Sequence, residues 1–218
     1  MTGNRTVTWT IALTGAFILA LAVADLAATK FVALPGGIYA PGGVFLFSVI
    51  FVVRDALHRI AGQGYVKRVI WVAAGLNLAM AAYFLMVANM PSAPFFDLGG
   101  PWDTIFALTP AIVLGSIAAA VGSQYVNTWV YERLWRAERP MWVRTIVSNA
   151  VSLPVDSALF VGLAFVALPA VFGATPISFA DAGARLVEGQ IIVKALTVLI
   201  LTPILYLTPY NRQADPTA

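Results

Sequence analysis

Residues 8–28 read TWTIALTGAFILALAVADLAA and include one charged residue, Asp25. A membrane crossing needs about 20 mainly apolar residues, because the hydrocarbon core is about 30 Å thick and an α-helix rises about 1.5 Å per residue. The stretch is long enough for one full crossing, and no small-residue cleavage site of the signal-peptide type follows it. We therefore expect a retained transmembrane helix near the start of the chain.

The composition extends this expectation to the rest of the chain. Of the 218 residues, 60% are hydrophobic and 11% are charged, and the mean hydropathy is +0.85. A soluble domain usually carries about 25% charged residues, so this chain has too little charge for a water-facing surface. We predict an all-α integral membrane protein with a single transmembrane domain over residues 1–218, built as a bundle of six helices. The predicted spans are residues 8–28, 44–60, 69–90, 110–134, 143–172 and 186–207.

Proline and glycine mark the interruptions between and within these spans. Residues 34–43 read LPGGIYAPGG and predict a turn or re-entrant backbone between the first two spans. Residues 91–101 form a second stretch that is rich in helix breakers. The fifth span is unusually long, and we expect it to be tilted or to break near Pro154.

Basic residues lie mainly on one side of a six-span topology. That side holds Arg5, Arg59, Lys67, Arg68, Arg133, Arg136, Arg139 and Arg212. The opposite side holds Lys30 and Arg185, together with the acidic residues Asp97, Asp103 and Asp181. Cytoplasmic loops of membrane proteins carry an excess of Lys and Arg, so we predict that both termini are cytoplasmic.

Polar residues follow one face of the fifth span at helical spacing. They are Thr145, Ser148, Asn149, Ser152 and Asp156. An ionisable residue inside a span costs about 2.5–3.5 kcal/mol on insertion scales, and it is retained when it pairs, faces water or binds something. Two interpretations stay open, namely a structural network of interhelical hydrogen bonds and the wall of a polar interior. For Asn149 and Asp156 we favour a binding role.

Other spans add polar groups that could face the same interior. In the sixth span Gln190, Lys194 and Thr197 share one face, and Lys194 is the natural partner for Asp156. This pair is either structural or part of a site with a carboxylate acceptor and a cationic donor in low dielectric. In the fourth span Gln124 and Asn127 supply amides, which suit a ligand with mixed donors and acceptors.

The second and third spans contribute less. Arg54, Asp55, His58 and Arg59 lie in the final turns of the second span, where charged side chains usually extend to the cytoplasmic interface. Asn77 is the one strongly polar residue in the middle of the third span.

Several function classes find no support in the sequence. The chain has no cysteine, which excludes disulfides, thiolate zinc sites and iron–sulfur clusters. A metal site at the single histidine, His58, would need partners that are not evident. The motifs of intramembrane hydrolases and the glycine loops that hold phosphates are absent, so we predict neither an enzyme nor a cofactor. A transporter or a membrane binding subunit for a small polar solute remains.

Three stretches and one lysine together resemble a known family. The stretches are PGGVFLFSVIFVVRDALHRIAG (residues 41–62), SQYVNTWVYERL (residues 123–134) and SNAVSLPVDSALFVGLAF (residues 148–165), and the lysine is Lys194. They are similar to the motifs of the queuosine precursor transporter family, also called the vitamin uptake transporter family. The resemblance covers nearly the whole chain, and its specificity lies in the combination.

The resemblance implies six spans, a location in the bacterial cytoplasmic membrane and uptake of 7-deazaguanine bases such as 7-cyano-7-deazaguanine, which are precursors in tRNA modification. It implies that Asp156 accepts the guanine-like donor edge of the base. The other expected substrate-binding residues are Ser148, Asn149, Gln124, Asn127, Lys194, Asn77, Asp55 and Arg54, with Phe45, Phe47 or Phe160 stacking on the base. Asn127 stands where many members carry Asp, which puts proton coupling and the preferred deazapurine in doubt.

A second function stays open beside this one. Alanines at positions 12, 16, 20, 24 and 28 give the first span a ladder of small residues, which lets another helix approach closely. Substrate-binding subunits of energy-coupling-factor vitamin importers are similar six-helix bundles that dock through such a surface. The ladder therefore fits bundle packing, a homo-oligomer or a docking subunit. The expected partners are a deazapurine base and the lipid bilayer, and no nucleic acid.

Overall fold

The computed structural model describes residues 2–201, apart from the side chains of residues 2–5, 55, 58, 59, 63, 141, 142, 144, 145 and 198. Its α-helices are α1 (Thr2–Ala27), α2 (Val44–Ala61), α3 (Gln63–Ala88), α4 (Gly99–Ala107), α5 (Thr109–Arg136), α6 (Met141–Val161) and α7 (Ala184–Leu201). The strands are β1 (Phe31–Leu34) and β2 (Ile38–Pro41). Shorter helical segments are η1 (Gly162–Ala167), η2 (Pro169–Phe172) and η3 (Phe179–Gly183).

The helices confirm a multi-pass membrane protein. Among the described residues, four stretches are long and apolar enough to cross a membrane, namely Thr6–Ala27, Gly64–Ala88, Gly99–Arg136 and Ile146–Ala167. They contain most of the predicted first, third, fourth and fifth spans. The predicted second span lies on α2, whose apolar part Val44–Arg54 is shorter. The predicted sixth span starts on α7 and continues to residue 207, outside the described residues, so the count of six stays a prediction.

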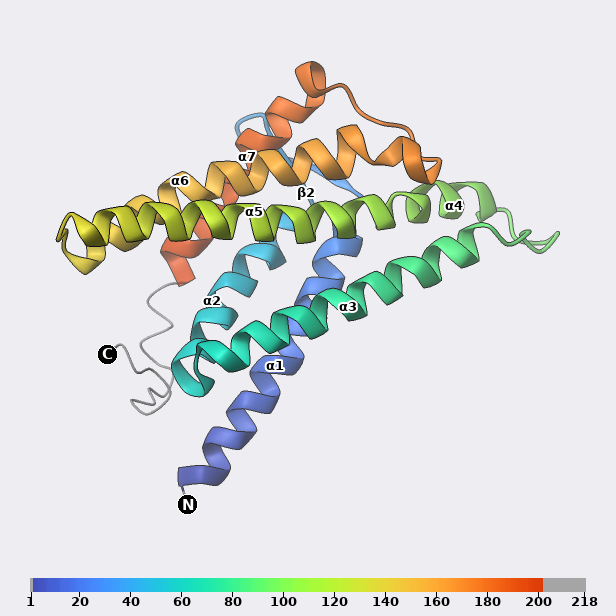
Figure 1. Ribbon diagram of the computed structural model, residues 1–218. Helices are drawn as coiled ribbons and strands as arrows, with labels where there is room; N and C mark the ends of the chain where they lie inside the picture. Colours follow the sequence, from blue (N-terminus) through green and yellow to red (C-terminus); the bar gives the residue numbers. More distant parts are fainter. Residues whose placement is uncertain (1, 202–218) are drawn as a thin grey trace.

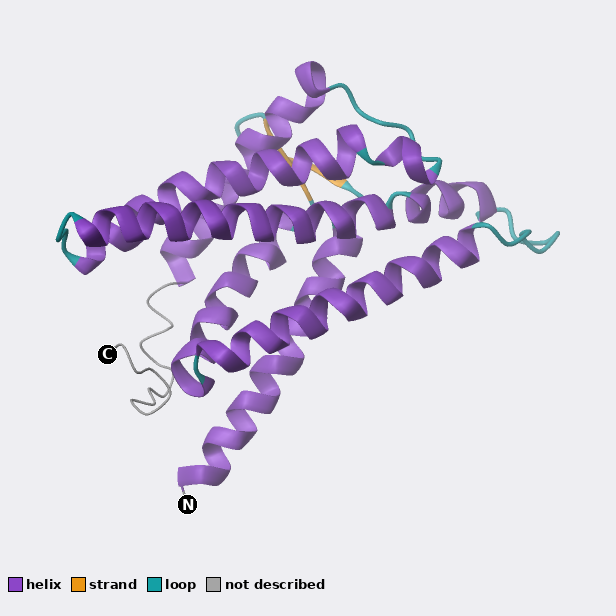
Figure 2. Ribbon diagram, in the orientation of Figure 1, coloured by secondary structure: helices purple, strands orange, loops and turns teal. Residues whose placement is uncertain are grey.

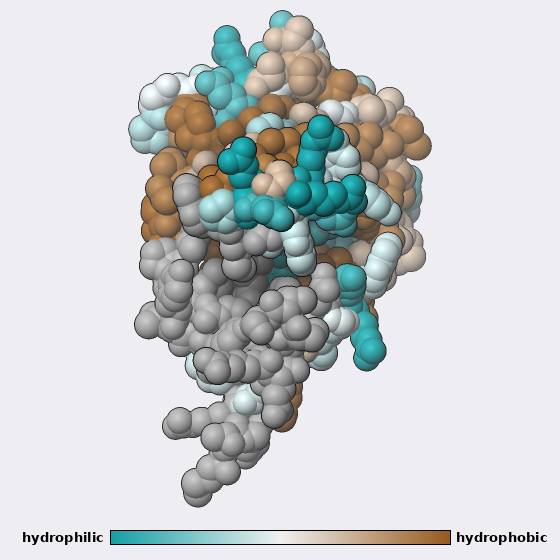
Figure 3. Space-filling view, turned by 60° about the vertical axis from the view of Figure 1, so that its left-hand side comes forward, coloured by the Kyte–Doolittle hydropathy of each residue, from teal (hydrophilic) through white to brown (hydrophobic). Residues whose placement is uncertain are grey.

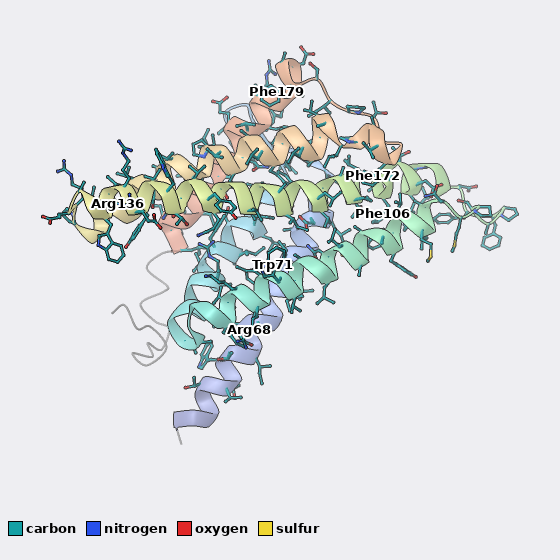
Figure 4. The ribbon with its side chains drawn as sticks, viewed as in Figure 1. Arg68, Trp71, Phe106, Arg136, Phe172 and Phe179 are labelled. Atoms are coloured by element: carbon teal, nitrogen blue, oxygen red, sulfur yellow. The ribbon has the colours of Figure 1, made fainter. Side chains whose placement is uncertain are left out.

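The helices run between two ends of the molecule, which lie at the lower left and the upper right of Figure 1. The lower-left end, called the basic end here, carries the α2–α3 and α5–α6 connections and the exposed side chains of Lys67, Arg68, Arg133, Arg136 and Arg139. The opposite end, called the hairpin end, carries residues 89–98 at the far right and the start of α7 at the top, and β1 and β2 lie toward it behind α5 and α6. Figure 4 shows Arg68 and Arg136 toward the first end, and Phe106, Phe172 and Phe179 toward the second.

The surface agrees with this division. Figure 3 brings the basic end forward and shows hydrophilic side chains gathered there between hydrophobic flanks. Large apolar side chains such as Trp71, Leu199 and Ile200 are exposed along the helices. A belt of exposed apolar side chains between polar ends is what a bilayer requires.

The predicted turn within residues 34–43 is part of an antiparallel hairpin, coloured orange in Figure 2. Leu34 pairs with Ile38 across the turn, and Phe31 pairs with Pro41 at the open end. This pairing satisfies backbone donors and acceptors that bare re-entrant backbone would leave open. The hairpin packs on α7 at Gly189, where an added Cβ would collide with the backbone carbonyl of Tyr39.

The fifth span does not break at Pro154. The regular α6 continues through Pro154 to Val161, and the backbone then changes to the π-helix η1 and the 3-10 helix η2. A proline removes one backbone hydrogen bond, but α6 lies antiparallel beside α5 over its whole length (Figure 1), which holds it straight. The irregular segment falls instead where Ala164 packs on Gly115 of α5.

Among the described residues two larger hydrophobic clusters hold the bundle together, and a smaller one of Ala40, Val44 and Val193 joins the hairpin to α2 and α7. One larger cluster joins α5, α6, η1 and α7 around Ile112, Val161 and Phe165. The other joins α1, α2 and α3 around Phe17 and Leu57. The site described next lies between these two larger clusters.

Candidate functional site

A small cavity lies where α1, α2, α5, α6 and α7 come together. Its lining residues are Ala24, Asp25, Ala28, Pro41, Gly43, Val44, Phe47, Ala119, Asp156, Phe160, Gln190 and Lys194. Four of them, Asp156, Lys194, Phe47 and Phe160, are residues that the sequence singled out for binding. Its volume is about 10 Å³, which is room for about one water molecule.

Lys194 and Asp156 form an ion pair in the cavity wall. The Lys194 Nζ lies 2.7 Å from Asp156 Oδ2, and the side chains are 3% and 6% exposed. The same Nζ donates to Gln190 Oε1 at 2.7 Å, and Ser123 Oγ donates to the second carboxylate oxygen at 3.0 Å. The predicted partnership is therefore present. Each charge has additional polar contacts, which a buried ion pair needs to be tolerated.

A second carboxylate faces the cavity from α1. Asp25 is 1% exposed, and it accepts hydrogen bonds from Asn77 Nδ2 at Oδ2 and from Ser116 Oγ at Oδ1, both at 2.6 Å. Asn77 was expected to bind substrate directly, but its amide points to Asp25 and it is not among the residues that line the cavity. Asp25 was not among the expected site residues, although a carboxylate inside a 21-residue apolar stretch is itself a signal of function.

Aromatic rings connect the cavity to the hairpin. Phe47 and Phe160 lie with ring centroids 6.3 Å apart, and the Lys194 Nζ lies 5.6 Å from the Phe47 centroid. Phe160 contacts Phe165 edge to face at 5.6 Å, and Phe165 contacts Phe31 of β1 at 4.9 Å. The four rings form a continuous chain of aromatic contacts from the cavity to β1.

The predicted amides lie between the cavity and the basic end. Asn127 Nδ2 donates to Asn149 Oδ1 at 2.8 Å and to Ser152 Oγ at 3.2 Å. These contacts join α5 to α6 one to two turns beyond Asp156. Asn149 is exposed, and Gln124 on α5 is exposed as well, so none of the three amides lines the cavity.

Three of the remaining predicted site residues, Ser148, Phe45 and Arg54, do not line the cavity. Ser148 is buried on α6. Phe45 is 44% exposed, so only Phe47 and Phe160 of the three expected stacking rings line the cavity. The Arg54 guanidinium lies over the Phe51 ring at 5.3 Å. The side chain of Asp55 lies outside the described residues.

The alanine ladder along the first span has a buried part and an exposed part. Ala24 and Ala28 are buried at the cavity. At Gly43 an added Cβ would collide with the carbonyl oxygen of Ala24, so the close contact between α1 and α2 depends on that glycine. Ala12 and Ala16 are exposed. The part of the ladder formed by Ala24 and Ala28 therefore packs within the bundle.

Comparison with known proteins assigns the family. Residues 41–208 match the family described as "Putative vitamin uptake transporter". The chain belongs to this family. It is accordingly a multi-pass protein of the cell membrane from a transporter family, and the matched region contains every cavity-lining residue except Ala24, Asp25 and Ala28.

One curated relative has a name that states its cargo. The chain is 28% identical over 137 residues to a protein of Bacillus subtilis (strain 168) named "Probable queuosine precursor transporter". The alignment covers 61% of this chain and 59% of the relative, so the chain spans less than two thirds of that protein's length. No solved structure matches the chain.

The site combines chemistry that suits a flat, polar, uncharged molecule. Its wall offers the Asp156 carboxylate as an acceptor, an ammonium and an amide as donors, and two aromatic rings. In a buried setting of low dielectric, each unmatched polar group is costly, so such a wall discriminates strongly between ligands. Among the described residues no cluster of three or more His, Asp or Glu side chains is placed to hold a metal ion.

Proposed function

We propose that this protein imports a queuosine precursor, a 7-deazaguanine base such as 7-cyano-7-deazaguanine, and binds it in the cavity. The observation that carries the proposal is the Lys194–Asp156 pair beside the Phe47 and Phe160 rings. The cargo class comes from the name of the Bacillus relative. The wall supplies what such a base needs, namely an acceptor for its donor edge, a donor for its carbonyl and rings for its flat face.

Each group has a distinct role in this proposal. Asp156 accepts the donor edge of the base, and Lys194 with Gln190 donates to its carbonyl oxygen. Before the base binds, Lys194 satisfies both Asp156 and Gln190. Because the Lys194 ammonium has three N–H donors, it keeps its bond to Asp156 while it donates to the base in place of Gln190, and no buried charge is left unpaired during binding.

Binding requires the cavity to widen. A base stacked between two rings needs them about 7 Å apart, which is two stacking distances of about 3.5 Å. The Phe47 and Phe160 centroids are 6.3 Å apart and the rings are tilted by 37°, and the cavity is smaller than a base. We expect the rings to separate and become parallel as the base enters, so that an opening movement is part of each transport cycle.

The orientation of the protein in the membrane is inferred from the charge distribution. The basic end carries the exposed Lys and Arg side chains, so we assign it to the cytoplasm and assign the hairpin end to the opposite side. The chain of aromatic rings then leads from the cavity toward the outer side. The polar groups of Asn127, Asn149 and Ser152 lie on the inner side and provide hydrogen bonds along the route of release.

A docking subunit of an energy-coupling-factor importer is the second candidate. The exposed Ala12 and Ala16 of α1 favour it, because small residues permit close approach of another helix. The two candidates differ in what they need. A secondary carrier moves its cargo alone, whereas a docking subunit needs an ATPase partner.

The binding claim is tested by thermal unfolding of the purified protein. We expect 7-cyano-7-deazaguanine to raise the melting temperature in a concentration-dependent way, since a ligand of the folded state stabilises it by mass action. Adenine, which lacks the donor edge and the carbonyl, is the control and should not do so. A protein that responds to neither 7-cyano-7-deazaguanine nor guanine would contradict the proposed cargo.

A further inference from the structure

Asp25 is a buried carboxylate whose hydrogen-bond partners are both uncharged. It lies in the last turns of α1, and its two oxygens accept from Asn77 of α3 and Ser116 of α5. With 1% exposure it has almost no contact with solvent, and it also lines the cavity. The mechanism proposed above does not use it.

No positive charge reaches Asp25 from the helices packed around it, among the side chains that the structure describes. On α6 and α7 the charged groups at the cavity are Asp156 and Lys194, which are paired with each other. The part of α2 at the cavity contributes Val44 and Phe47, and α5 contributes Ser116 and Ala119. Asn77 comes from α3, and the nearest basic residues of that helix, Lys67 and Arg68, are exposed and lie about 13 Å or more further along it. The charged positions of α2 from Arg54 onward lie about 10 Å or more further along the helix than Phe47. Lys30, beyond the end of α1, is exposed.

A carboxylate in this setting requires a compensating proton or cation, because an isolated ion in low dielectric is strongly disfavoured. The two partners suit a group that changes its protonation state. A serine hydroxyl both donates and accepts, and an asparagine side chain offers NH₂ or, after rotation, a carbonyl oxygen. Asn77 and Ser116 can therefore donate to the carboxylate, and either can accept from the carboxylic acid.

From this arrangement we infer that Asp25 is a proton-binding site that couples the proton gradient to cargo movement. The inference rests on the proposed function as a transporter. One carboxylate oxygen takes a proton from water on the outer side, and the same O–H bond breaks when the proton is released to water on the cytoplasmic side. Asp25 and the Lys194–Asp156 pair face one cavity. The helix movements that open this cavity to either side therefore expose both the proton site and the cargo site.

The test uses the full-length protein in liposomes with labelled 7-cyano-7-deazaguanine. For the natural protein, an outside-acid pH gradient should drive accumulation, and cargo entry should acidify the lumen, as reported by a trapped pH-sensitive dye. Asp25→Asn should lose gradient-driven accumulation while it retains cargo exchange at equal pH on both sides. This variant keeps the size and polarity of the side chain, and its melting temperature shows whether it folds.

Each outcome is decisive. Accumulation that follows a sodium gradient and ignores a pH gradient would overturn the proton site. Net cargo entry through the natural protein without lumen acidification would overturn it too, independently of any variant. Loss of both exchange and ligand-induced stabilisation in folded Asp25→Asn would make Asp25 a cargo contact instead. Absence of any exchange by the natural protein is a different result, which contradicts the proposed cargo and, with it, the coupling.

Discussion

Lys194 of α7 and Asp156 of α6 lie with Nζ and Oδ2 2.7 Å apart, and both side chains are almost fully buried. Removing one partner of such a pair is expected to cost about 3–5 kcal/mol, because the other charge stays buried without compensation. The pair therefore contributes to the stability of the fold as well as to the proposed site, and a test must separate the two effects.

Asp156→Asn should lower the melting temperature strongly, whereas Asp156→Asn with Lys194→Gln should restore much of it, because no buried charge is then unpaired. Both variants should lose uptake of the base. Thermal unfolding and liposome uptake measure the two effects. The matched control is Glu132→Gln with Arg136→Gln, which removes an exposed ion pair 3.6 Å apart. This control should change neither the melting temperature nor the uptake by much. Full uptake by the neutral Asp156–Lys194 double variant would contradict the site.

Phe47→Leu should weaken binding of the base while the protein stays folded. The substitution keeps an apolar side chain but removes the stacking ring, and stacking of a base on an aromatic side chain is worth about 1–3 kcal/mol. Isothermal titration of the purified protein measures the dissociation constant. Phe45→Leu is the control, since Phe45 is 44% exposed and lies away from the cavity. Equal affinities of the two variants would argue against stacking at Phe47.

Gly189→Ala should destabilise the protein because the new methyl group would meet the backbone carbonyl of Tyr39 and separate α7 from β2. Gly75→Ala on α3 is the control, since nothing lies within 4 Å of its added Cβ. Alanine is also the better helix former by about 1 kcal/mol, so the control should be neutral or stabilising. The melting temperatures of the two variants are compared with that of the natural protein. An equal fall for Gly189→Ala and Gly75→Ala would contradict the close packing of the hairpin on α7.

The orientation is testable by cysteine labelling, because the natural chain has no cysteine. Asp97→Cys at the hairpin end should react with a membrane-impermeant maleimide in intact cells. Arg136→Cys at the basic end should react only after the membrane is opened. The reverse pattern would place the basic end outside and would contradict the proposed orientation.

The helices could be predicted from the sequence because hydrocarbon thickness fixes their length and apolar character. The hairpin carried a readable signal that was missed. The apolar runs of residues 31–34 and 38–40 flank a short Pro-Gly-Gly turn, which is typical of paired strands. The short α4 was not predicted, because residues 91–101 are rich in helix breakers. The structure places the Phe106 ring of α4 with its centroid 4.1 Å from that of Trp102 and 4.6 Å from that of Phe84 on α3.

The site was predictable in part for a similar reason. Asp156 and Lys194 stood out because each interrupts an apolar helix, and their opposite charges suggested the pair. Asp25 interrupts its helix as well, but its significance depends on Asn77 and Ser116, which are 52 and 91 residues away. Helical spacing also placed Asn149 on the same polar face of α6 as Asp156. It could not show that Asp156 lines the cavity whereas Asn149, two helical turns away, is exposed.

Uptake by the purified protein tests the central claim most directly. Liposomes that contain only this protein should accumulate labelled 7-cyano-7-deazaguanine in a saturable manner, and an excess of the unlabelled base should compete. Liposomes with the folded Asp156→Asn, Lys194→Gln double variant should behave like protein-free liposomes. No saturable uptake by the natural protein, or equal uptake by the double variant, would contradict a 7-deazaguanine transporter whose site is the Lys194–Asp156 cavity.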